Sequence, residues 1–331
     1  MTLPSHDTSL RETRDGARMK TLPLLITLVS LVGCAPERTD APKEEPRTVP
    51  SSLEAAQESY LKGDWLTMND RLRDVLVDRS ASELVRQNAF EVLDKAYEAT
   101  NGKLPSRYQL PPFVRTITLG SMRGEHRWAT YRTIFFYAQL EKGLGTHVQD
   151  LTVRTEPDHA TVLDRASGLG KWRVTPREKF DEIVLEAQNV AAPLPDGVTT
   201  FHLGFDDGRA IDTWAFVRGL GSSASPEVAS PTAEATLSDP SPTFEWTPFR
   251  SPEYASFEDR SVSIYVADNT TKGEAFDQYV WAPGELSRWK VDKKLAPGSY
   301  WLAFTCQEER SFGGIRLSRH SQRGVPFTIV P

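Results

Sequence analysis

The sequence is poor in cysteine and has no cluster of basic residues. Only two cysteines, Cys34 and Cys306, occur among 331 residues, so the chain cannot rest on a disulfide framework. Aspartate and glutamate outnumber lysine and arginine by 45 to 39, and the formal net charge is -6. Because affinity for nucleic acid depends on clustered Lys and Arg side chains, this composition argues against a nucleic-acid partner.

Long hydrophobic runs are also absent. An uncharged apolar run covers residues 22–32 and follows Arg18 and Lys20. A bilayer core of about 30 Å requires about 20 helical residues, so this run is too short to span it. Basic residues before a short apolar run, with small residues at its end, are typical of an export signal. A buried core helix is disfavoured because the run continues past Cys34 into a charged, proline-rich segment.

The residues Leu31-Val32-Gly33-Cys34 resemble the lipobox of bacterial lipoproteins. This resemblance implies a signal peptide at residues 1–33, an acylated thiol on Cys34 and a lipidated tether over residues 34–50. In that family the residue after the cysteine helps to select the membrane, and Ala35 implies the outer membrane of a bacterial cell envelope. Met19 is the more ordinary start of such a signal, so residues 1–18 are either an extended leading region or not translated.

Helical periodicity is confined to residues 51–103. Apolar residues recur at helical spacing on one face, and Gly63-Asp64 separates a first helix from a second, with Asp64 as the expected N-cap. The stretch from Ala55 to Val77 resembles a tetratricopeptide-repeat hairpin. Since a solenoid needs about three repeats to bury its core, we expect two or three helices that form a small cap.

From residue 104 the pattern changes to alternation. Short segments rich in β-branched and aromatic residues, separated by Gly, Pro and Asp, predict an antiparallel β-sandwich over residues 104–220. Asp206-Asp207-Gly208 predicts a tight hairpin within it. Residues 221–236 are small and proline-rich, which indicates a linker.

Residues 237–331 resemble a fibronectin type III or bacterial immunoglobulin-like module. Phe244 and Trp246 stand on an early strand, and residues 295–300 lead into a long strand. Tyr300 matches the tyrosine at the corner of such modules, whose hydroxyl bonds back to the backbone. The predicted fold is therefore mainly β, with two tandem antiparallel β-sandwiches after a small helical segment.

No motif predicts catalysis, a metal or a cofactor. Residues 167–171 lack the glycine spacing of a phosphate loop, and Trp172 stands where Ser or Thr is needed, which argues against nucleotide binding. The histidines His126, His147, His159 and His202 form no i,i+4 pair. Adjacent acidic pairs, Asp206 with Asp207 and Glu308 with Glu309, face opposite sides of a strand, so we expect turn or solvated roles.

These observations favour a non-enzymatic, lipid-anchored envelope protein that presents β-sandwich modules to a protein or a polysaccharide. One alternative is a structural spacer or assembly factor of an envelope complex. Another is an enzyme whose site forms between domains, where His159, His202 or carboxylates would converge. Fold analogy alone does not choose among the three.

Alternation along the long C-terminal strand makes two further predictions. Tyr300, Leu302, Phe304 and Cys306 share the inner face, so Cys306 should be a buried free thiol. Trp301 then points outward, as does Tyr265 on the strand expected beside it. Two such aromatics would form a platform for a sugar ring or an apolar side chain, unless the chain itself covers them.

Overall fold

The computed structural model describes residues 49–331 except 127–128, 222–226, 248–258, 269–275 and 285. The chain divides into two compact units, Met1–Glu45 and Pro46–Pro331, and the description below concerns the second. The predicted signal peptide and Cys34 lie outside the described residues. Among the helices that are described, none has the length and apolarity needed to span a membrane.

Three helices open the described chain: α1 (Val49–Leu61), α2 (Trp65–Val77) and α3 (Glu83–Ala99). As predicted, the first break lies at Gly63, whose φ is +70°, and Asp64 caps α2 by accepting a hydrogen bond from the Thr67 amide. Ser82 caps α3 in the same way. The helices bury apolar residues against one another and against the sandwich that follows, which makes them a cap.

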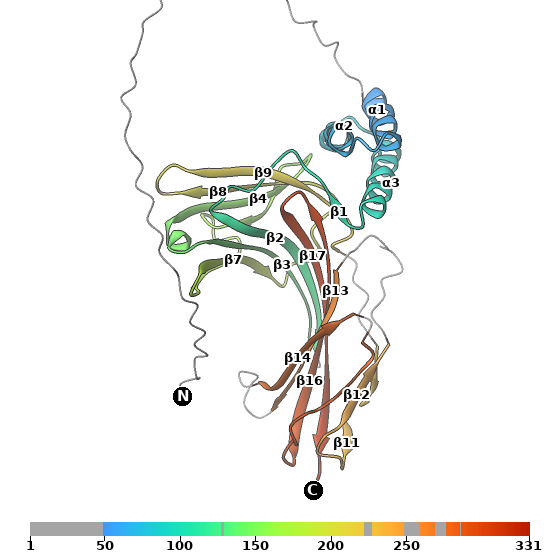
Figure 1. Ribbon diagram of the computed structural model, residues 1–331, viewed down its shortest axis with the longest axis vertical. Coiled ribbons are helices and arrows are strands. Elements are labelled where there is room, and N and C mark those ends of the chain that lie inside the picture. Colours follow the sequence, from blue (N-terminus) through green and yellow to red (C-terminus); the bar gives the residue numbers. More distant parts are fainter. Residues whose placement is uncertain (1–48, 127–128, 222–226, 248–258, 269–275, 285) are drawn as a thin grey trace, which may run out of the picture. The chain divides into compact units, whose positions relative to one another are not determined.

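The described strands form three sheets (Figure 1). The large sheet has the order β14 (Phe276–Pro283), β13 (Asp259–Asp268), β16 (Gly298–Phe312), β17 (Ile315–Ile329), β2 (Val114–His126), β3 (Ala129–Glu141), β7 (Phe180–Gln188) and β6 (Lys171–Pro176), with β1 (Lys103–Leu104) beside β16 and β11 (Ala235–Leu237) beside β17. The second sheet has the order β5 (Ala160–Asp164), β4 (Val148–Thr155), β8 (Gly197–Phe205) and β9 (Ala210–Val217), and the third has β10 (Val228–Ser230), β12 (Thr243–Trp246) and β15 (Arg288–Lys290). A short 3-10 helix, η1 (Leu144–His147), precedes β4.

The predicted mainly β fold with three preceding helices is confirmed, and the structure adds a connection that the sequence does not predict. The two sandwiches share the large sheet, because β17 pairs in parallel with β2, from Ile315 beside Ile117 to Arg323 beside Glu125. The hairpin of β16 and β17 has 15 residues in each strand and therefore reaches both sandwiches. Residues about 200 positions apart thus become neighbours.

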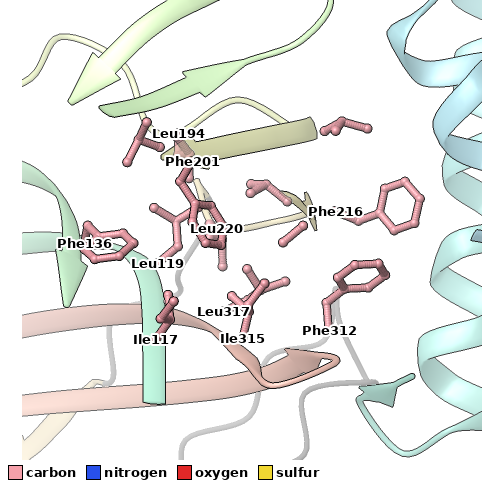
Figure 2. Packing of buried hydrophobic residues seen from close by; sticks show 14 of the residues in the cluster. Ile117, Leu119, Phe136, Leu194, Phe201, Phe216, Leu220, Phe312, Ile315 and Leu317 are labelled. Atoms are coloured by element: carbon pink, nitrogen blue, oxygen red, sulfur yellow. The ribbon is translucent and has the colours of Figure 1, made fainter. Parts of the chain in front are cut away.

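Two cores lie on the same face of the large sheet. The first core lies against β4, β8 and β9, and Figure 2 shows Phe136, Phe201 and Phe312 within it. The second core joins β12 to β13, β16 and β17 and contains Phe304 and Cys306. Residues two apart on a strand share a face, and alternate residues of β16 enter the second core and then the first. The opposite face of the large sheet carries neither core, and we call it the open face.

The predictions for the inner face of β16 are confirmed. Tyr300, Leu302, Phe304 and Cys306 are all buried, and Cys306 forms no disulfide. Burial raises the pKa of the Cys306 thiol, so the thiol stays protonated. The Tyr300 hydroxyl donates to the Ala296 carbonyl at 2.9 Å, as expected of the corner tyrosine.

A buried ionic centre lies between the two cores. Glu308 and Arg319 are both fully buried and form a short hydrogen-bonded ion pair. Arg319 also donates to the Gly219 carbonyl at 3.0 Å. The solvated role expected for Glu308 is therefore wrong, because its face of β16 continues from one core to the other, whereas the prediction that Glu308 and Glu309 face opposite sides is confirmed.

The same centre joins the helical cap to the sheets. The Arg310 guanidinium lies 4.5 Å from the centroid of the Tyr97 ring on α3 and donates to the Arg218 carbonyl at 2.7 Å. The Arg218 side chain in turn bonds Asp94 of α3 at 3.1 Å and Asp196 at 2.6 Å. Burial lowers the pKa of Arg310 and raises that of Tyr97. Charged groups thus hold α3 to the region where the sandwiches meet.

Candidate binding face

The open face is hollowed where five strands of the large sheet lie side by side. In Figure 1 this part of the sheet bends, and the open face is its concave side. This hollow has a volume of about 600 Å³, and a second hollow of about 610 Å³ lies on the outer side of the four-stranded sheet. The hollow on the open face is lined by side chains from β2, β3, β7, β16 and β17. It therefore crosses the parallel pair that joins the sandwiches.

Three glycines on the open face are each covered by an aromatic ring from the neighbouring strand. A Cβ placed on Gly120 would lie 2.3 Å from Cζ of Phe135, and one on Gly124 would lie 2.1 Å from Cζ of Tyr131. Phe135 and Tyr131 stand directly opposite these glycines on β3. Such rings compensate for the side chain that glycine lacks, and they also form a flat aromatic floor.

The third pair brings in Trp301. A Cβ on Gly324 of β17 would lie 1.7 Å from Cζ2 of Trp301 on β16, so the indole covers that glycine. Trp301 remains partly exposed. All three aromatic residues occupy the face opposite Tyr300, Leu302 and Phe304, which is the open face.

The predicted platform of Tyr265 and Trp301 stays a prediction. The two residues lie on neighbouring strands, as expected, because β13 pairs with β16. Their register is diagonal, with Tyr265 opposite Ala303 and Trp301 opposite Ala267. The side chain of Tyr265 is outside the described residues.

Polar groups at one end of the hollow are held in place by a hydrogen-bond chain. Gln139 donates to the Tyr137 hydroxyl at 2.6 Å, and that hydroxyl donates to Glu182 at 3.1 Å. Glu182 also pairs with Arg177 at 2.7 Å. Burial is the main cause of the raised pKa of Tyr137, so its phenol is neutral at physiological pH.

The positive and negative charges that line the hollow are equal in number. They are two arginines, Arg115 and Arg316, and two glutamates, Glu186 and Glu309. Arg316 lies 3.8 Å from Glu309. His320 also lines the hollow, with its ring 5.3 Å from that of Phe135, and burial lowers its pKa to about 4. The imidazole is therefore neutral at physiological pH and adds no charge to this surface.

The second hollow lies on the outer side of the four-stranded sheet. His202 is 2.7 Å from Asp212 and 3.9 Å from Asp150, on neighbouring strands. His159 lies elsewhere, beside Glu156, and does not line this hollow. Among the described lining residues there is no serine or cysteine, and no described group of His, Cys, Asp and Glu could hold a metal ion. His126 has no described side chain.

The comparisons with known proteins name β-sandwich modules. No protein family and no curated protein sequence matches the chain. Among solved structures, the fibronectin(III)-like modules of CbhA from Clostridium thermocellum share 9% identity at a TM-score of 0.21, over 64% of this chain and 94% of theirs. The Ig1-2 module of the Drosophila receptor tyrosine phosphatase DLAR shares 14% identity at a TM-score of 0.25, over 60% of this chain and 91% of its own. TM-scores below 0.5 support no conclusion about function.

Most aromatic residues of the open face could not be predicted from the sequence. Alternation along β16 predicts that Trp301 points outward. For Phe135, Tyr131 and Tyr137 the sequence indicates only that they lie in a β-strand. The feature that points to two of these aromatics is a glycine within the neighbouring strand: Gly120 lies opposite Phe135, and Gly124 lies opposite Tyr131. That signal becomes visible only once the register of β2 with β3 is known.

Proposed function

We propose that this protein is a non-enzymatic, lipid-anchored protein of the bacterial cell envelope that holds an extended partner, a protein or a polysaccharide, on the open face. The observation that carries the proposal is the sheet surface itself. It spans five strands, is lined by aromatic and hydrogen-bonding side chains, and crosses the parallel pair of β17 with β2 that joins the sandwiches. Aromatic anchors supply much of the binding energy at interfaces.

The anchor in this proposal is the acylated Cys34, with signal peptide 1–33 removed and residues 34–50 acting as the tether. A lipobox-like Leu31-Val32-Gly33-Cys34 supports it, together with the charged, proline-rich segment that follows. Ala35 supports the outer membrane as the location. The tether would hold the binding face away from the bilayer.

An enzymatic role has weaker support. His202 does meet two carboxylates, but on one sheet surface and with Asp212 largely exposed, and not in a cleft between domains. Catalytic pairs generally need water excluded around the reacting group. A protein that only spaces or assembles other components would not need an open aromatic surface.

Co-purification from the native envelope tests the proposal. Val184 is a partly exposed residue of the open face on β7, and Thr200 is a partly exposed residue of the outer hollow on β8. Val184→Arg places a long charged side chain in the open hollow, and Thr200→Arg is the matched control. We expect the partner to be lost with Val184→Arg and kept with Thr200→Arg; retention with both variants would refute the proposal.

A further inference from the structure

The rings on the open face lean across the sheet. Phe135, Tyr131 and Trp301 each reach over the glycine of the next strand with atoms at the far end of the ring. Neighbouring strands are about 4.8 Å apart, so a side chain that covers the adjacent backbone must lie along the sheet and cannot stand upright. One face of each ring is then against the sheet, and the other is turned away from it.

The three rings follow one line. Gly120 lies beside Ser318, and Gly124 lies beside Gln322, two residues before Gly324 on the same strand. The covered glycines therefore extend along β17 from Ser318 to Gly324, which is six steps or about 20 Å at roughly 3.3 Å per step. A ligand that touches all three rings must be linear and about this long.

We propose that the open face binds a neutral, linear polysaccharide, an inference that rests on the proposed function and names its ligand. Ring faces turned away from the sheet suit the flat apolar side of a sugar ring. Two partly exposed amides in the hollow, Gln139 and Gln307, supply donors and acceptors suited to hydroxyls. Gln139 is already oriented by its bond to Tyr137.

Charge and shape favour this ligand over the other polymers. An acidic glycan would require unmatched cations, whereas Arg115 and Arg316 are matched by two glutamates in the same hollow. A protein partner would bring apolar side chains, but the aliphatic lining consists of Val184 and Met122. An extended peptide that adds a strand needs a sheet edge, and this surface lies over internal strands whose backbone is paired on both sides.

Calorimetric titration of the full chain in detergent micelles tests the inference. The probes are hexasaccharides of β-linked glucose, of β-linked N-acetylglucosamine and of acidic galacturonate. We expect binding of a neutral hexasaccharide, weaker binding of its trimer, and no tighter binding of the acidic one. Phe135→Leu and Tyr131→Leu should each weaken binding about tenfold, because leucine still covers the glycine but lacks the aromatic face.

Two controls separate stacking from folding. Tyr131→Phe keeps the ring and should bind within about twofold of the wild type. Tyr108→Leu removes a partly buried aromatic from a different hollow, beside Leu66 and Trp214, and should leave binding unchanged. Melting temperatures of all variants report whether the fold is kept.

Several results would overturn the inference. They are failure of both neutral hexasaccharides to bind, tighter binding of the acidic one, or wild-type binding by both leucine variants. If the neutral probes fail while Val184→Arg still removes an envelope protein, the ligand class is wrong and the proposed function stands. If Val184→Arg also keeps its partner, both are wrong.

Discussion

At the scale of single residues, burial decides which groups titrate and which hold the fold. His320 shows the first effect, because its pKa is lowered from an ordinary 6.5 to about 4 by burial in the open hollow. The folded protein keeps this imidazole neutral where an unfolded chain would protonate it. Its Nε2 lies 2.8 Å from the Ser318 hydroxyl oxygen. A neutral imidazole can accept a hydrogen bond from that hydroxyl.

A pH dependence of stability follows from His320. Between pH 6.5 and pH 4 the unfolded chain binds a proton that the folded protein does not, so the free energy of unfolding falls as pH falls. From pH 7 to pH 5 this residue should account for a loss of about 1 to 2 kcal/mol. Urea unfolding of the wild type and of His320→Gln at pH 7 and pH 5 should show that difference. If the free energy of unfolding changed equally with pH in the two proteins, the pKa of His320 would not be lowered in the folded state.

The ion pair of Glu308 and Arg319 shows the second effect. Removing one charge leaves the other buried without compensation, which typically costs about 3 to 5 kcal/mol. We therefore expect Glu308→Gln to lower the free energy of unfolding by about 3 kcal/mol or more. Glu309→Gln, on the open side of the same strand, is the control and should cost about 1 kcal/mol or less. Equal losses in urea denaturation would contradict a buried ionic centre.

At the scale of elements, one side chain of the chain segment after β9 contributes to the attachment of the helical cap. Arg218 bonds Asp94 on α3 and Asp196, and its guanidinium lies 4.8 Å from the Phe90 ring centroid. Arg218→Met keeps the aliphatic stem but removes these bonds. Hydrogen exchange should become faster in α3 and stay unchanged in β12, which belongs to the second core; equal protection of α3 in both proteins would show that apolar packing alone holds the cap.

Element types were predictable, and their partners were not. Helical spacing and the Asp64 cap predict α1 and α2, and period-two alternation predicts the buried side of β16 down to Cys306. Alternation says which residues share a face, but it does not say which strand lies alongside. The parallel pair of β17 with β2 depends on tertiary packing between segments about 200 residues apart, and the burial of Glu308 follows from it. The three glycine and ring pairs depend in the same way on the registers of β2 with β3 and of β16 with β17.

At the scale of the whole molecule, the proposal requires both an anchor and a binding face. Cys34→Ala should release the protein from the membrane fraction, because it removes the thiol proposed to be acylated, and the run at residues 22–32 is too short to span a bilayer. Fractionation with a salt wash measures this. A variant that stays in the membrane after the wash would contradict a lipid anchor at Cys34.

The central claim is that a partner occupies the open face, and photo-crosslinking in the native envelope tests it most directly. A benzophenone side chain placed at Met122 lies in the open hollow, and one placed at Asp212 lies in the hollow on the outer sheet. We expect a discrete adduct from position 122 and none from position 212. An adduct from position 212 alone, or equal adducts from both, would contradict it.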